Sequence, residues 1–378
     1  MTNENNSRRG RAWIELDRGA LENNVSVLSR RLPKGCALMP AVKANAYGHG
    51  VQELVPELLR LGIRDFCVAT APEGAAVRAL GASGTVLVLG WTAPEQYGLL
   101  RDYDLTQTAV NCAHAGELAC AGGNLRVHLA VDTGMHRLGE DCENFERIAT
   151  ALGLSGLRAE GMFTHLCCAD SADAQSAAFT LRQLERFAAL KQRLCAAGFE
   201  NIKTHALNSG GILVYPEHGG DFARPGIALY GVLSTAEDTL RIGDRLRPVL
   251  SLRARIASVK HLRPGEGAGY GLDFRAGRES TLAVLTIGYA DGLPRCLSNG
   301  AGRVLINGRF APIAGRICMD QTIADVTGIP GVCPGGEATL IGRSGGETIG
   351  ACELAARCGS ISNEILSRLS ERLERFVI

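Results

Sequence analysis

A lysine stands where an apolar run gives way to a polar, glycine-rich turn. Lys43 closes the run 36–42 and opens the segment Ala44-Asn-Ala-Tyr-Gly-His-Gly50. An amine at such a place can form a Schiff base with a carbonyl if burial or a nearby cation lowers its pKa below the free value of ~10.4. A solvated loop lysine is the alternative, because most lysines are exposed. The other motifs of the chain decide between these two interpretations.

A second group of residues is suited to binding an anion. Asn208-Ser-Gly-Gly211 follows one apolar run, and Arg224-Pro-Gly-Ile227 lies at the next. Glycines let a ligand approach the backbone closely, and N–H groups at the start of a helix can hold a dianion such as phosphate. A glycine pair alone is weak evidence, since turns use it routinely.

Short β-rich runs alternate with longer helical ones from Ala37 to Tyr230, which is typical of βα units around a parallel sheet. Eight such units favour a closed (β/α)8 barrel of the TIM type over an open doubly wound sheet. In such a barrel, active residues lie at the carboxyl ends of the strands, and phosphate commonly binds near strands seven and eight. The expected strands are Ala37–Val42, Phe66–Thr70, Thr85–Leu89, Thr106–Val110, Arg126–Val131, Arg158–His165, Lys203–Leu207 and Ala223–Tyr230. The clearest helix carries Leu184, Phe187, Leu190 and Leu194 on one face and ends at Gly198.

The pattern changes after Pro248, where apolar and polar residues alternate from Leu250 to Ile256 as in a half-buried strand. Asn307-Gly308 stands between two further β-rich runs and predicts a tight hairpin turn. A mainly antiparallel β domain is therefore expected, closed by an amphipathic segment with Leu366, Leu369 and Leu373 on one face. The predicted divisions are a disordered lead-in or linker stub at 1–11, a barrel domain at 12–247 and a β domain at 248–378.

Composition points to a small-molecule partner. The 378 residues carry a net charge of +1, which gives no global field to attract nucleic acid or an anionic membrane. Thirteen scattered cysteines without a C-x-x-C pair indicate reduced cytosolic thiols rather than disulfides or a zinc site, and no metal is expected. No apolar stretch approaches the ~18–20 residues that span a bilayer. A cytoplasmic protein is expected, with a membrane association only if a longer native chain carries a membrane domain.

Eight segments, in order, resemble the motifs of alanine racemases, which are fold-type III enzymes dependent on pyridoxal 5'-phosphate (PLP). The resemblance runs from about Trp13 to the C-terminus. The segments are Ala41-Val-Lys-Ala-Asn-Ala-Tyr-Gly-His-Gly50, Val131-Asp-Thr-Gly-Met-His-Arg-Leu-Gly139, Phe163-Thr-His165, Asn208-Ser-Gly210, Arg224-Pro-Gly-Ile-Ala-Leu-Tyr-Gly231, Gly269-Tyr-Gly271, Gly288-Tyr-Ala-Asp-Gly292 and Gly315-Arg-Ile-Cys-Met-Asp-Gln321.

The resemblance implies that Lys43 holds the cofactor and serves as one base, and that Tyr270 of a second subunit is the opposite base. A homodimer with shared active sites is therefore expected. Two bases suit racemisation because one group removes the Cα proton from one face while another returns a proton to the other face. A free tyrosine has a pKa of ~10 and needs cationic neighbours to favour phenolate, which His165 and Arg224 would supply.

The resemblance also assigns the remaining contacts. Arg224 would meet the pyridine nitrogen, and because guanidinium gives up its proton reluctantly, the ring would stay largely neutral and transamination would be suppressed. Tyr47, Asn208, Ser209, Gly226 and Ile227 would bind the cofactor through its phosphate. Arg137 and the backbone at Met319 would hold the substrate carboxylate. Tyr289 would line the entry of the site or the site of the partner subunit, and Asp320 would order its loop. His49 is interpreted as a turn residue and Cys318 as a packing residue.

Two positions depart from the family pattern. Ala130 stands where many alanine racemases have a lysine, often carbamylated, that orients the carboxylate-binding arginine. Asn363 stands where the family usually has a tyrosine, and the shorter amide leaves room for a substrate hydroxyl and could hydrogen-bond to it. This second change is similar to that of the serine racemases of vancomycin-resistant bacteria, whose catalytic part is joined to a membrane domain. Racemisation of serine and alanine is therefore expected, supplying D-amino acids for peptidoglycan precursors.

Two alternatives use related folds. A single-barrel cofactor carrier shares the lysine strand but lacks a β domain such as the one expected here. A two-domain amino-acid decarboxylase typically places an acid at the pyridine nitrogen, where this chain has Arg224. Both fit the residues less well than a racemase does.

Overall fold

The computed structural model describes residues 9–243 and 245–378, so the predicted lead-in at 1–11 lies mostly outside the described residues. The chain forms two compact units. Unit 1 comprises residues 1–21, 47–53 and 230–378, and unit 2 comprises residues 22–46 and 54–229. Each unit is described by itself, and the predicted division at residue 247 stays a prediction.

Unit 2 is built on an eight-stranded parallel barrel, which confirms the predicted fold class. Strands β3, β4, β5, β6, β8 and β9 pair in that order, and β10 pairs in parallel with β2. Two sets of backbone bonds close the ring: Val42 N donates to Cys67 O at 2.8 Å, and Arg224 N donates to Leu207 O at 2.8 Å. The strands are β2 Ala37–Leu38, β3 Phe66–Val68, β4 Val86–Val88, β5 Thr106–Ala109, β6 Leu125–Asp132, β8 Leu157–Phe163, β9 Lys203–His205 and β10 Phe222–Ala223, with the short β7 Glu140–Asp141 beside β6.

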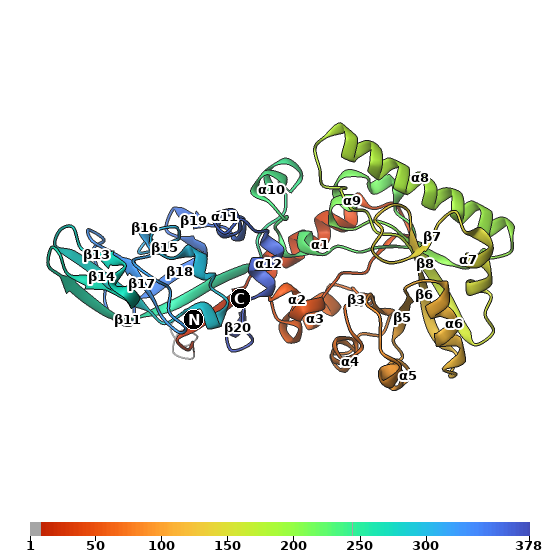
Figure 1. Ribbon diagram of the computed structural model, residues 1–378, viewed down its shortest axis with the longest axis horizontal. Coiled ribbons are helices and arrows are strands. Elements are labelled where there is room, and N and C mark those ends of the chain that lie inside the picture. Colours follow the sequence, from red (N-terminus) through yellow and green to blue (C-terminus); the bar gives the residue numbers. More distant parts are fainter. Residues whose placement is uncertain (1–8, 244) are drawn as a thin grey trace. The chain divides into compact units, whose positions relative to one another are not determined.

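Helices connect the strands and lie around them, as Figure 1 shows for α4 to α8. The longest of them, α8, begins at the cap Asp173, whose carboxylate accepts a bond from Ser176 N at 2.8 Å, and its four predicted apolar residues are buried. The helices in this half of the chain are α1 Arg18–Arg31, α2 Lys43–Tyr47, α3 Val51–Arg60, α4 Ala71–Ala79, α5 Tyr97–Asp102, α6 Cys112–Cys120, α7 Phe145–Leu152, α8 Ala174–Ala196 and α9 Ser209–Val214. Nowhere in 9–243 or 245–378 does a helix have the length and apolar character needed to cross a membrane.

Unit 1 is built on a nine-stranded, mainly antiparallel sheet around the long strand β11, Leu250–Leu262. The first seven residues of β11 alternate between buried and partly exposed positions, as predicted. Asn307 and Gly308, with φ of 50° and 75°, form the predicted hairpin turn between β15 and β16. The other strands are β1 Ala12–Leu16, β14 Ser280–Leu285, β15 Arg303–Ile306, β16 Arg309–Pro312, β17 Thr322–Asp325, β18 Glu337–Ser344, β19 Glu347–Ile349 and β20 Glu374–Val377, with β12 Gly267–Ala268 and β13 Phe274–Arg275 as a separate pair.

Two local expectations need correction. The eighth barrel strand ends at Ala223, and residues 227–230 form a 3-10 turn because the chain must leave the barrel there. The closing segment is not one amphipathic helix: α12 ends at Ser367, and the chain then turns into β20. Leu366, Leu369 and Leu373 are nevertheless all buried. From the other end of the chain, β1 pairs with β11 and β20, a non-local contact that local pattern cannot reveal.

Short helices complete the described chain. They are α10 Ala236–Ile242 and α11 Ala351–Arg357, with α12 at Ser362–Ser367. The 3-10 turns are η2 Pro94–Gln96, η3 Pro216–His218, η4 Ile227–Tyr230, η5 Tyr270–Leu272, η6 Tyr289–Asp291 and η7 Arg295–Leu297.

Candidate active site

Lys43 is followed by a left-handed turn. Ala44, Asn45, Ala46 and Tyr47 have φ between 52° and 54°, although none of them is glycine. A left-handed conformation costs an L-residue roughly 1–2 kcal/mol because Cβ crowds the following carbonyl. Strain of this kind is held only where the surroundings enforce it, and it gathers at functional sites.

Glu73 of α4 anchors this turn. Its Oε1 accepts a bond from Ala44 N at 2.8 Å, and its Oε2 accepts one from Ala69 N at 2.7 Å. At the other end of the turn, Ala46 N donates to Val42 O at 2.9 Å. A carboxylate from the neighbouring βα unit therefore helps to fix the backbone on which the Lys43 side chain is mounted.

The Lys43 amine is easier to deprotonate than a solvated lysine. Burial lowers its pKa first, and the charges of Arg137 and, less strongly, Arg224 lower it further. Cys67 and Glu73 act in the opposite direction. The surroundings therefore favour the neutral amine, which is the form that can attack a carbonyl or accept a proton.

Arg224 is buried in the barrel and its guanidinium is held by several acceptors. Nη2 donates to Thr164 O at 2.7 Å, Nη1 donates to His205 O at 2.9 Å, and a further short bond joins Nη1 to His205 Nδ1. The guanidinium also lies 5.0 Å from the centre of the Phe163 ring. Burial lowers its pKa to about 10, which still leaves it protonated at neutral pH. Its Nε–H takes no part in these bonds and is left for another acceptor.

Two buried histidines extend this network, and sequence reasoning missed both. His205 Nε2 lies 2.8 Å from His128 Nδ1, so a chain of polar contacts runs from Arg224 through His205 to His128. Their signal was a histidine within each of two predicted barrel strands, 126–131 and 203–207, because a buried histidine needs a polar partner.

His165 lies beside Arg224, as expected, but it is neutral rather than cationic. Its Nδ1 is 3.5 Å from Arg224 Nη2. Burial, followed by the charges of Arg224, Arg137 and Lys43, lowers the pKa of His165 to about 3. His165 is therefore neutral, and the prediction that it is a cationic neighbour was wrong because burial beside cations disfavours its protonated form. Arg224 is the cation of this pair.

The candidate phosphate segments lie together at the ends of the last strands. Ser209 Oγ accepts bonds from Gly226 N at 2.9 Å and Ala228 N at 3.2 Å. Asn208 caps α9 by accepting a bond from Gly211 N at 2.9 Å. The segment at Ile227 therefore packs against the start of α9, and the Ser209 hydroxyl proton remains available to a ligand.

The predicted carboxylate-binding loop is ordered by one acid. Asp132 Oδ1 accepts bonds from Gly134 N at 2.8 Å and His136 N at 3.1 Å, and these bonds lower the pKa of Asp132. Arg137 follows on the same loop and is exposed. Ala130, at the position of the family lysine, is buried and offers no polar atom of its side chain.

Unit 1 carries the other candidates. Tyr270, Met319 and Tyr289 are 69%, 53% and 41% exposed, which is unusual for large apolar side chains. Asn363 lies at the start of α12, where its Oδ1 accepts a bond from Ser234 Oγ at 3.1 Å.

Tyr47, His49 and Asp320 are the other candidates of unit 1. The Tyr47 ring is 5.1 Å from the Tyr230 ring, and His49, which is buried, stacks on Tyr230 at 4.4 Å. His49 Nδ1 lies 3.1 Å from Tyr47 O, which agrees with a turn residue. Asp320 Oδ1 pairs with Arg372 Nη2 at 2.7 Å.

The residues of unit 2 fit PLP. An aldehyde needs a neutral amine, and the pKa of Lys43 is lowered. A pyridine nitrogen needs a donor, and the buried Arg224 has an Nε–H outside its network. A phosphate needs hydroxyl and backbone donors, which Ser209 and the start of α9 can provide.

Comparison with known proteins identifies the family of this chain. The alanine racemase N-terminal domain matches residues 16–234, and the alanine racemase C-terminal domain matches residues 249–377. The chain is 40% identical to an alanine racemase of Carboxydothermus hydrogenoformans, over 97% of this chain and 99% of that protein. It is 39% identical to an amino-acid racemase of Enterococcus faecalis over 96% of this chain, but it spans only about half, 51%, of that relative's length.

Solved structures give the same result. The crystal structure of alanine racemase from Bacillus anthracis with bound L-Ala-P has a TM-score of 0.89 and 30% identity, covering 97% of this chain and 95% of that one. Alanine racemase from Enterococcus faecalis has a TM-score of 0.88 and 32% identity, covering 97% and 98%. The two-domain match leaves the carrier and decarboxylase alternatives without support. The chain therefore belongs to the alanine racemase family, whose members are fold-type III racemases dependent on pyridoxal phosphate.

Proposed function

We propose that this protein interconverts the L and D enantiomers of alanine and serine, with Lys43 and Tyr270 as the two bases. The observation that carries the proposal is the half-buried Lys43 amine, whose pKa is lowered by burial and by Arg137 and Arg224, in a chain with both racemase domains. The products would be D-amino acids for peptidoglycan precursors, including those of vancomycin-resistant cells. Alanine is supported by the names of most relatives, and serine by Asn363.

When bound, PLP would supply an electron-withdrawing ring that makes the Cα–H of the substrate more acidic. Lys43 Nζ, as the neutral amine, accepts or returns the proton on one face of that carbon. Tyr270 Oη accepts or returns the proton on the opposite face. Arg224 keeps its own proton, because its pKa is about 10, and it therefore donates a hydrogen bond rather than a proton.

The Tyr270 side chain is exposed, which supports the proposal that it contributes to the active site of a second copy of the chain in a homodimer. His165, which is neutral, would accept or donate a hydrogen bond at the phenol without adding charge. The substrate carboxylate would bind to the Arg137 guanidinium and to the Met319 N–H.

Asn363 supports the inclusion of serine. Its Oδ1 already accepts the Ser234 hydroxyl proton, which turns the NH2 end of the amide away from Ser234. An amide N–H can donate to a substrate hydroxyl, whereas the family tyrosine would fill that space. A site that satisfies a substrate hydroxyl discriminates more strongly than one that merely has room.

The test is Asn363→Tyr, with both substrates assayed by chiral chromatography. The ratio of kcat/KM for serine to that for alanine should fall by about tenfold or more, because one hydrogen bond is lost and the pocket becomes smaller. Asn363→Asp, which keeps the size but removes the N–H donors, should lower the same ratio without crowding alanine. An unchanged ratio in both variants would rule out a role for Asn363 in serine recognition.

A further inference from the structure

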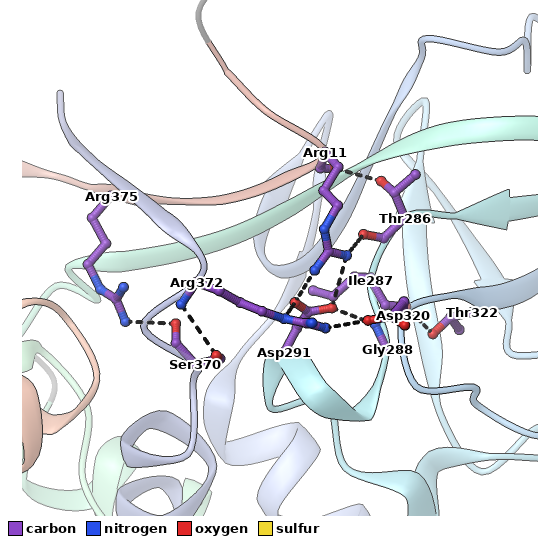
Figure 2. A network of polar contacts seen from close by, with 10 residues as sticks. All are labelled: Arg11, Thr286, Ile287, Gly288, Asp291, Asp320, Thr322, Ser370, Arg372 and Arg375. Carbon is purple, nitrogen blue, oxygen red and sulfur yellow. Dashed lines mark hydrogen bonds and ion pairs between the residues drawn. The ribbon is translucent and has the colours of Figure 1, made fainter.

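A buried acid in unit 1 joins three distant parts of the chain. Asp291 ends the 3-10 turn η6 and is 0% exposed. Its Oδ1 accepts bonds from Arg11 Nη2 at 2.6 Å and Arg372 Nε at 2.7 Å, while its Oδ2 accepts Gly288 N at 2.9 Å (Figure 2). A fully buried carboxylate costs several kcal/mol unless such partners satisfy it. The bonds of Asp291, the last residue of η6, therefore hold in place the turn that carries Tyr289.

Arg372 uses the second arm of its guanidinium for a different acid. Its Nη2 donates to Asp320 Oδ1 at 2.7 Å, so one planar fork bridges Asp291 and Asp320, as Figure 2 shows. The planar, permanently charged guanidinium suits two acceptors at fixed angles, which a lysine ammonium does not match. Asp320 is half exposed and follows Met319 directly.

The two segments held by Arg372 are also joined through their backbones. Tyr289 N donates to Cys318 O and Ala290 N donates to Met319 O, both at 3.0 Å. The approach is so close that a Cβ at Gly288 would lie 2.3 Å from Cys318 O. The Met319 carbonyl is thus engaged, and within the described chain no bond uses the Met319 N–H, the group proposed to meet the substrate carboxylate.

We propose that Arg372 is a positioning residue that fixes the Met319 loop against the Tyr289 turn and neutralises Asp320 beside the carboxylate-binding N–H. The inference rests on the proposed function of Met319. Without Arg372, the unpaired carboxylate of Asp320 would lie next to the Met319 N–H, which is proposed to bind the substrate carboxylate. Both the loss of order and this repulsion weaken the binding of an anionic group more than they change proton transfer.

The test compares Arg372→Gln with wild type as full-length holoenzyme. We expect KM for alanine and the Kd of propionate, a carboxylate without an amino group, each to rise about tenfold, while kcat changes by less than about threefold. Arg368→Gln is the matched control, because Arg368 lies in the same segment and, among the described residues, forms an ion pair only with the exposed Glu364 at 3.1 Å. Propionate binding is measured by calorimetry and does not depend on turnover.

The double variant Arg372→Gln/Asp320→Asn distinguishes a positioning role of Arg372 from a general loss of folding stability. Removing the bare carboxylate should restore KM and the propionate Kd by about threefold relative to Arg372→Gln, a recovery that a merely destabilised fold would not show. If Arg372→Gln does not fold, Arg372→Lys replaces it, and the same partial recovery on adding Asp320→Asn is expected.

Two results would overturn the inference: a KM and propionate Kd equal to those of Arg368→Gln, or a further loss in the double variant. Wild-type protein that binds propionate but racemises neither amino acid would refute the proposed function instead. The two failures are therefore distinguishable.

Discussion

At the scale of single residues, burial decides which ionisable groups around Arg224 can carry charge. His128 and His165 both have a pKa lowered to about 3, chiefly by burial, and the pKa of His205 lies well below its ordinary value for the same reason. All three are neutral at physiological pH, and Arg224 keeps the charge. The arrangement concentrates one permanent cation at the place proposed for the pyridine nitrogen.

The histidines predict an acid-labile fold. Between pH 3 and the unfolded value of 6.5, the unfolded chain binds protons that the native chain excludes. The free energy of unfolding should therefore fall as the pH falls through this window, with a slope that approaches ~1.4 kcal/mol per pH unit for each histidine.

The variant His128→Gln isolates one of these contributions, because glutamine does not titrate. Urea unfolding between pH about 7 and about 5 should give a slope shallower than that of wild type by up to ~1.4 kcal/mol per pH unit. Parallel curves for the two proteins would contradict the low pKa of His128.

Sequence pattern singled out candidate residues but not their charge state. Lys43 and Ser209 follow apolar runs, a position visible in the sequence, whereas Arg224 was expected inside the eighth strand and in fact follows its end. The neutrality of His165 depends on burial beside Arg224, and the roles of Asp291 and Arg372 depend on bonds across 81 positions of the chain. Such properties are tertiary and have no local signal.

At the scale of elements, the turn after Lys43 is the unusual feature. Ala44 is exposed and has a φ of 52°, so its methyl group bears a conformational penalty without the benefit of burial. The bond from Ala44 N to Glu73 holds the turn in place. A strained turn of this kind aims the preceding side chain in one direction, which suits an amine that must meet a fixed carbonyl.

We predict that Ala44→Gly stabilises the protein by up to ~1 kcal/mol, because glycine adopts positive φ without the steric cost. Ala188, exposed in the right-handed helix α8, is the control. Ala188→Gly should destabilise by ~1 kcal/mol. Thermal unfolding of both variants checks the prediction, and a loss of stability in Ala44→Gly would show that the turn is not left-handed.

Elements with strong local signals were predictable, and those set by distant partners were not. The hairpin at Asn307-Gly308, the alternation in β11 and helix α8 follow from turn chemistry and periodicity. The left-handed turn contains no glycine before Gly48, so local propensity argues against it. Leu366 and Leu373 share a helical spacing, yet only Leu366 lies in α12, because the helix ends at Ser367 and Leu373 directly precedes β20, which pairs with β1.

At the scale of the whole molecule, the exposed Tyr270 and Met319 are consistent with our proposal that a second copy of the chain completes the site. Under that proposal the catalytic pair would come from two subunits. Activity would then be a property of the dimer rather than of the single chain.

Mixing two inactive variants tests the sharing. Lys43→Ala and Tyr270→Phe should each lose nearly all activity, but a heterodimer has one site with both native residues. Random reassociation should therefore restore about a quarter of the wild-type rate, because half of the dimers are mixed and each has one intact site of two. Chromatography confirms the dimers, and a mixture that stays inactive would mean that both bases come from one chain.

The central claim is that Lys43 and Tyr270 exchange the Cα proton of an amino acid from opposite faces with the help of bound PLP. The most direct measurement follows L-alanine and L-serine with the holoenzyme in D2O by chiral chromatography and mass spectrometry. The account predicts that the D enantiomer of each forms and carries one deuterium at Cα. Amino acids that stay in the L form and unlabelled would contradict it.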